Sequence, residues 1–193
     1  MFNEGWAAAK RGHTPQGIEQ MQRGLAAYEA TGAKLWLPYL LGLLAEALSD
    51  ADRSQEGLAA ITNALALAEQ RSEGYAIAEL YRIIGELTIK SEVRNSASRL
   101  QPKRANDGAT SQRVLQAQDC FAKGLAIARG QHARSWELRI IISSCRLEEQ
   151  PNEPSYSQLA ESYSWFTEGH ATEDLRKAKI LLNTIKPPAE WML

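Results

Sequence analysis

Apolar residues recur every three or four positions along most of the chain, the spacing that places them on one face of an α-helix. Ile18, Met21 and Leu25 form the first clear stripe, which begins at Thr14-Pro15, and Gly32 ends it. No alternating strand pattern of useful length is present, so the sequence predicts an all-α fold. The expected helices cover about 14–32, 34–51, 54–72, 75–90, a segment from about 112, and 133–148, 155–168 and 172–185.

Small and large residues also recur at a spacing of 40. Gly17 and Gly57 are 40 apart, as are Met21 and Ile61, and Phe121 lies a further 60 residues along. A 20-residue insertion in the third copy would produce this change from 40 to 60. A fixed period of this length is typical of stacked helical hairpins, each too small to bury its own apolar face. The same spacing relates the small residues Gly5, Ala45, Gly85 and Cys145.

The period divides the chain into one helical repeat domain, 1–186, and a tail, 187–193. The predicted units are about 1–32, 33–73, 74–131, 132–169 and a capping helix at 172–185. Within the third unit the apolar pattern disappears between Ser91 and Ser111, so an inserted loop is expected at 91–110. A solvated insertion is favoured there over a basic loop that binds a partner.

Composition and charge limit the possible partners and cellular location of the protein. The chain has 193 residues, 44% of them hydrophobic, and 22 basic and 23 acidic residues leave a net charge of −1. That balance provides no electrostatic reason to expect nucleic acid or an anionic membrane surface as a partner. No apolar run has the ~20 residues of a membrane span, and Met1–Gly5 lacks the order of a signal peptide. Cys120 and Cys145 lie on apolar helix positions, so we expect reduced cysteines in a soluble, cytoplasmic protein.

Catalytic motifs are not apparent. No Gly-Lys-Ser/Thr phosphate loop occurs, and acidic residues fall only on helix faces and at turns. His13, His132 and His170 lie at predicted helix boundaries without a second His or Cys at ligand spacing. The sequence therefore predicts a protein that is not an enzyme and has no metal or cofactor. Trp36 and Trp136 hold equivalent positions, where bracing between repeats is favoured over ligand contact.

Stacked helical hairpins present a concave groove lined by the first helix of each pair. In the predicted register, acid lies toward one end of this groove and base toward the other. The groove suits an extended peptide or a helix of a protein partner, and a merely solvated charged face is the alternative. Charge reversal at Arg82 and Arg139 is expected to weaken capture of a partner without unfolding the chain. The residues expected to face the groove are Tyr39, Glu46, Glu79, Arg82, Glu86, Arg139 and Arg146.

The order of large and small residues resembles the tetratricopeptide repeat. Leu41, Leu44, Ala45 and Leu48 match the first helix of its pattern, and the second helix is matched by Gly57, Ile61 and Ala64. The resemblance implies a right-handed superhelical solenoid of antiparallel helix hairpins. The period of 40 departs from the usual 34 and resembles the long repeats of maltose-activator-type regulators, which would imply small-molecule sensing.

A second resemblance covers nearly the whole chain. The segments 24–33, 79–87, 135–139 and 165–169 with Asp174-Leu175 are similar to the C-terminal repeat region of bacterial adenylate/guanylate cyclase–ATPase or transcription-regulator fusion proteins. This resemblance implies a sensing or scaffolding role, because the cyclase and ATPase modules would lie upstream. The chain could also be a remnant of such a regulator that lacks its catalytic module. A helical-repeat RNA binder is disfavoured by the near-zero net charge.

The first unit is expected to be incomplete. Gly5 aligns with Ala45, which lies in the middle of a predicted helix, yet only four residues precede Gly5. The chain is therefore expected to be the C-terminal part of a longer array. Apolar surface around Trp6 would then be open to a partner, to an upstream repeat or to self-association.

Overall fold

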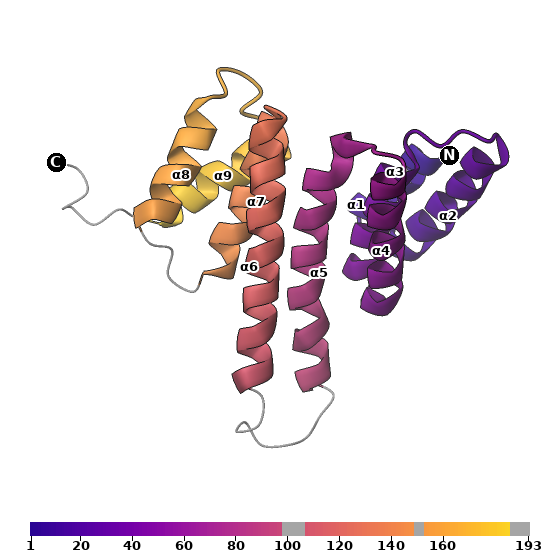
Figure 1. Cartoon of the computed structure of the whole chain (residues 1–193), viewed down its shortest axis with the longest axis horizontal. Helices are drawn as coiled ribbons and strands as arrows, with labels where there is room; N and C mark the ends of the chain where they lie inside the picture. Colours follow the sequence, from indigo (N-terminus) through magenta and orange to yellow (C-terminus); the bar gives the residue numbers. More distant parts are fainter. Residues whose placement is uncertain (98–106, 149–152, 186–193) are drawn as a thin grey trace.

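The computed structural model describes the backbone of residues 1–97, 107–148 and 153–185, and the side chains of these residues except 91–97 and 107–110. Within these ranges every regular element is helical, which confirms the all-α prediction (Figure 1). The elements are α1 (Phe2–Lys10), α2 (Thr14–Ala30), α3 (Leu37–Asp50), α4 (Ser54–Gln70), a 3-10 turn η1 (Gly74–Ala76), α5 (Ile77–Ala97), α6 (Asp107–Gly130), α7 (Arg134–Leu147), α8 (Glu153–Ser164) and α9 (Glu173–Thr184).

Consecutive helices pack in pairs, α1 with α2, α3 with α4 and α5 with α6, and each pair contacts the next. The odd-numbered helices also contact one another in order, from α1 through α3, α5 and α7 to α9. They therefore form one continuous layer. Figure 1 shows the pairs following one another from the N-terminal to the C-terminal end of the molecule.

The turns between helices repeat with the sequence. Gly12 and Asp52, 40 residues apart, have φ of +94° and +62°. Gly32, Ser72 and His132, at spacings of 40 and 60, have φ of +74°, +55° and +55°. Helices commonly end at a residue in this left-handed region, whose amide satisfies one of the last helix carbonyls. The period found in the sequence is thus also a period in backbone conformation.

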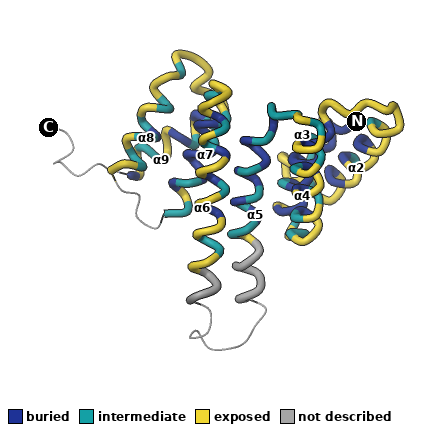
Figure 2. The backbone as a smooth tube through the Cα atoms, in the orientation of Figure 1, coloured by how far each residue is buried: buried dark blue, intermediate teal, exposed yellow. Residues whose placement is uncertain are grey.

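Small residues allow the paired helices to approach closely. A Cβ atom added at Gly5 would lie 2.7 Å from the carbonyl oxygen of Gly17, and one added at Gly17 would lie 2.6 Å from that of Gly5. The large residues of the same series, Met21, Ile61 and Phe121, are buried between the helices. Figure 2 shows this buried face along the helices of each pair. The packing role predicted for these positions is confirmed.

Helix extends into the predicted loop 91–110 from both sides, so the predicted loop is wrong at both ends. α5 continues to Ala97 and α6 begins at Asp107. α5 has 21 residues against 14 in α3, and α6 has 24 against 17 in α4. The two helices extend past the rest of the array (Figure 1). An apolar stripe marks the face of a helix that packs on a core and is not needed for the helix itself, so the loss of the stripe did not mark the end of α5. Residues 98–106 lie outside the described residues.

Two other boundaries differ from expectation. α3 begins at Leu37 instead of about 34, with Pro38 in its first turn, where the missing amide hydrogen costs nothing. α8 ends at Ser164 instead of 168, and Gly169 lies in the following turn with φ of +74°. The predicted tail 187–193 lies outside the described residues.

α1 has nine residues, against 14 in α3. Trp6 on α1 is 37% exposed. Self-association through this surface stays a prediction. Among the described residues, no helix combines the length and apolarity that a membrane crossing requires.

Candidate functional site

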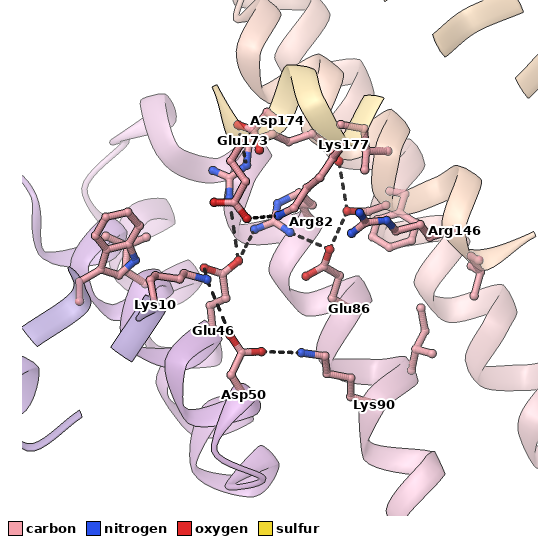
Figure 3. A pocket seen from close by; sticks show the side chains of 18 of the residues that line it. Lys10, Glu46, Asp50, Arg82, Glu86, Lys90, Arg146, Glu173, Asp174 and Lys177 are labelled. Atoms are coloured by element: carbon pink, nitrogen blue, oxygen red, sulfur yellow. Dashed lines mark hydrogen bonds and ion pairs between the residues drawn. The ribbon is translucent and has the colours of Figure 1, made fainter. Parts of the chain in front are cut away.

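A groove of about 560 Å³ lies along the layer of odd-numbered helices. Its walls come from α1, α3, α5, α7 and α9, with one contribution, Phe121, from α6. Figure 3 shows Lys10 on one side and Arg146 on the other, with Glu46, Arg82 and Glu86 between them. The lining residues are Trp6, Lys10, Tyr39, Leu43, Glu46, Asp50, Arg82, Glu86, Ile89, Lys90, Phe121, Arg139, Ile142, Ser143, Arg146, Leu147, Glu173, Asp174 and Lys177.

The structure brings together all seven residues that the sequence predicted for the groove. Glu79 differs from the others, because its side chain is fully buried and does not line the groove. It lies beneath the groove as a partner of Arg82 and Arg139. The other six residues line the groove, namely Tyr39, Glu46, Arg82, Glu86, Arg139 and Arg146. That these residues bind a partner stays a prediction.

Arg82 is the centre of the charged network, with 5% of its side chain exposed. Its Nη2 donates to Glu46 and to Glu79, each at 2.9 Å, and its Nη1 lies 2.8 Å from a carboxylate oxygen of Glu86. Burial alone would lower the pKa of Arg82, but the carboxylates raise it well above its usual value. We therefore revise the expectation that charge reversal here would leave the fold intact, because a buried cation would become a fourth carboxylate.

Arg139 on α7 extends this network of α3 and α5 to α7 and α9. Its Nη1 lies 2.6 Å from Glu79, its Nη2 3.9 Å from Glu46 and its Nε 3.7 Å from Asp174. Tyr39 on α3 lies against the same charges, and burial followed by the negative charge of Glu79 raises the pKa of its hydroxyl. These contacts join four odd-numbered helices through two guanidinium groups.

A second row of charges lies along the groove at a spacing of 40. Lys10 Nζ lies 2.9 Å from Glu46 and 3.7 Å from Asp50, and Lys90 Nζ donates to Asp50 at 2.7 Å. Burial alone would raise the pKa of Glu46, but Arg82 and Lys10 outweigh it and lower this pKa to about 2. Glu46 is therefore ionised at neutral pH.

Among the charged residues that line the groove, sequence reasoning missed two groups. Lys10, Asp50 and Lys90 were detectable, because they occupy one position of the 40-residue period. The contribution of α9, which includes Glu173 and Lys177, was not detectable. α9 lies outside the repeat register, and only the packing of α9 on α7 and α8 places it beside the groove.

The reactive residue types lie away from the groove. His13, His132 and His170 are exposed at helix ends or in turns, as predicted. In the part of the chain that the structure describes, no three His, Cys, Asp or Glu side chains are arranged to hold a metal ion. Cys145 is buried, and burial raises the pKa of its thiol to about 11, so the thiol is protonated at neutral pH.

Trp36 braces consecutive repeats, the role favoured by the sequence. Its ring packs edge-on against Tyr75, with 5.2 Å between the centroids. The Tyr75 hydroxyl donates to the carbonyl of Leu35 at 3.0 Å. Trp36 is nevertheless 51% exposed, so this contact lies at the surface of the molecule. Trp136 is partly buried against the Phe121 cluster.

Comparisons of this chain with protein-family models, with curated proteins and with solved structures give no match.

Proposed function

We propose that this chain is a non-catalytic scaffold of the cytoplasm, a right-handed superhelical solenoid of tetratricopeptide type that binds a protein partner. The observation that supports it best is the groove along the odd-numbered helices, which both apolar and charged side chains line. A groove that is continuous over several repeats suits an extended peptide or a single helix.

Equivalent positions of successive helices supply the groove with different chemistry. Trp6, Glu46, Glu86 and Arg146 occupy one position of the period, and all four line the groove. A framework position would be expected to keep the same kind of residue in each repeat, as the small residues at the helix crossings do. Variation from aromatic to acid to base at one position therefore supports recognition as the role of this surface.

The resemblance to the repeat region of cyclase–ATPase and transcription-regulator fusion proteins supports a role in signalling. We place the chain as the C-terminal part of such a regulator, so that the groove would receive a partner or an upstream domain. The reading frame immediately upstream of the coding sequence tests this placement. A signalling ATPase encoded there is the expected finding, and an unrelated gene would contradict it.

The binding proposal is tested by selecting decapeptides from a random displayed library on the immobilised protein. The affinities of selected peptides are then measured on Lys90→Glu and Lys123→Glu variants. Both lysines are about half exposed, 48% and 54%, and each pairs with one aspartate. Lys90 lines the groove, whereas Lys123 on α6 does not. We expect Lys90→Glu to weaken binding about tenfold and Lys123→Glu to leave it unchanged.

Two outcomes would overturn the binding proposal. One is failure of the library to yield any peptide enriched over the bare support. The other is an equal effect of the two charge reversals, which would place the binding surface away from the groove. Circular dichroism and thermal unfolding of each variant verify that the fold is retained.

The absence of catalysis is proposed from the residue types around the groove, and it needs its own test. The purified chain is incubated with ATP or GTP and Mg²⁺, and nucleotide hydrolysis and cyclic-nucleotide formation are measured. We expect neither to exceed the rate without protein. Turnover that copurifies with the chain through two further columns would contradict the proposal.

Small-molecule sensing is a second candidate, favoured by the size of the groove. A volume of about 560 Å³ lies within the range of ligand pockets. A thermal-shift screen with a panel of mono- and disaccharides and nucleotides tests this candidate. A rise in the midpoint of unfolding that Lys90→Glu removes and Lys123→Glu keeps would favour it over peptide binding.

A further inference from the structure

Arg146 differs from every other cation in the groove. The five others each have a carboxylate within 4.0 Å, namely Lys10, Arg82, Lys90, Arg139 and Lys177. Arg146 is exposed and forms no ion pair with any described residue. Its charge is therefore uncompensated within the part of the chain that the structure describes.

The repeat register explains why the fold does not require this charge. Arg146 lies at the position that holds Glu46 and Glu86 in the preceding units, and both of those carboxylates neutralise Arg82. The residue that corresponds to Arg82 in α7 is Ile142, which has no charge to neutralise. An acidic residue at position 146 would have no buried partner. The change of sign at this position is thus independent of the internal network.

Apolar side chains of α5 and α7 also line the groove. Ile89 on α5 and Ile142 and Leu147 on α7 line it together with Arg146. Ile142 is buried and the other two are partly buried. An ion pair formed beside apolar walls is stronger than one in open water, because the effective dielectric constant is lower. Figure 3 shows the Arg146 side chain at one edge of the groove.

We propose that Arg146 binds a carboxylate of the partner peptide, next to an apolar side chain that packs on Ile89, Ile142 and Leu147. This inference rests on the proposed function and specifies the ligand as an acidic-apolar peptide segment. The planar guanidinium can donate two parallel hydrogen bonds to one carboxylate, which fixes the orientation of the peptide as well as its charge. Charge complementarity selects this occupant over a basic or a neutral segment.

The displayed decapeptide library tests this inference directly. Peptides selected on the wild-type protein are expected to be enriched in Asp or Glu beside Leu, Ile or Phe. Selection on Arg146→Gln is expected to keep the apolar preference and lose the acidic one. A matched control is Arg176→Gln, because Arg176 is also exposed but lies on α9 outside the groove. Selection on that control should return the wild-type preference.

A double-substitution cycle then tests whether Arg146 and the peptide carboxylate contact each other. We expect Arg146→Gln to weaken the binding of a selected peptide about tenfold or more. A change of the acidic residue of the peptide to its amide should weaken binding to a similar extent. The two changes together should be little worse than either alone, because both remove the same ion pair. Arg146→Lys should fall between Gln and the wild type, because it keeps the charge and loses the paired donors.

Three outcomes would overturn the inference in different ways. Selected peptides that show no acidic preference would contradict the contact between Arg146 and a carboxylate, but they would leave groove binding intact. An acidic preference that survives Arg146→Gln would place the carboxylate on another cation. A library that yields no peptide would overturn the proposed function and this inference together.

Discussion

Arg82 and Glu79 are buried charges of opposite sign, and each compensates the charge of the other. The guanidinium of Arg82 contacts Glu46, Glu79 and Glu86, and Glu79 also contacts Arg139. Burying these ions costs free energy of solvation, which their mutual attraction offsets only while every partner is present. Each residue of the network therefore contributes to stability in a way that depends on its neighbours. Arg146 lies at the position of α7 that corresponds to Glu86 in α5, and it lacks such neighbours among the described residues.

Replacing Arg82 by Gln is expected to lower the free energy of unfolding by about 3–5 kcal/mol, because it leaves buried carboxylates without a counter-charge. Arg146→Gln removes the same kind of charge from an exposed position and should change stability by less than about 0.5 kcal/mol. Urea unfolding followed by circular dichroism measures both values. Equal effects of the two substitutions would show that the network does not stabilise the fold.

Stability is expected to fall in acid partly through Glu46. Its pKa is about 2 in the folded chain, below the value of 4.5 for a free side chain. The unfolded chain therefore takes up the proton first as the pH falls. The contribution of Glu46 is complete above about pH 5 and is lost between the unfolded and folded pKa values.

The corresponding measurement is the free energy of unfolding of the wild type and of Glu46→Gln between pH 7 and pH 3. We expect the wild type to lose more stability than the variant over this interval, by at most about 1.4 kcal/mol per pH unit. Parallel curves for the two proteins would contradict the assignment of this acid sensitivity to Glu46.

At the scale of the helices, close approach within each pair depends on small residues at fixed positions. Gly5 and Gly17 face each other so closely that either added Cβ would meet backbone atoms of the other helix. Gly130, at the end of α6, has no atom within 4 Å of the place where its Cβ would lie. These two kinds of glycine should respond in opposite directions to substitution.

Gly17→Ala should therefore destabilise the chain by about 1–3 kcal/mol, because backbone atoms cannot move aside for the new methyl group. Gly130→Ala should stabilise it by up to about 1 kcal/mol, since alanine loses less backbone freedom on forming a helix. Thermal unfolding of the two variants compares them directly. A stabilising effect of Gly17→Ala would show that the α1–α2 crossing is looser than described.

At the scale of the whole molecule, the buried apolar residues fall into three clusters along the array. The first joins α1 to α5, the second is centred on Phe121 with α5, α6 and α7, and the third joins α7, α8 and α9. The proposed solenoid would be stabilised mainly by contacts between neighbouring units. A destabilising substitution at one end should therefore lower stability mainly near that end.

Leu159 on α8 is fully buried in the C-terminal cluster. We expect Leu159→Ala to cost about 2–5 kcal/mol locally and to accelerate amide hydrogen exchange in α8 and α9. Exchange in α2 and α3 should stay close to the wild-type rate. Uniform acceleration along the chain would mean that the molecule unfolds as a single cooperative unit.

Most of the helices and the core were predictable from local pattern. The stripe formed by Ile18, Met21 and Leu25 lies on the buried face of α2, and the turn expected at Gly32 is present. The predicted loop at 91–110 failed because an apolar stripe reports contact with a core and not helix formation itself. α5 continues to Ala97, past the last residue of its apolar stripe.

Local pattern was enough to predict most of the helices, their period and six residues that line the groove, because helical spacing and repetition need no knowledge of the packing. Which of those charges are buried depends on the assembled fold. Glu79 and Arg82 have the same residue types as exposed neighbours, and their burial follows from how closely α3, α5 and α7 approach. The same packing placed α9 beside the groove and left Arg146 without a partner among the described residues. Ion pairs between helices depend on distances in the folded structure, and these distances cannot be derived from the spacing of residues along the chain.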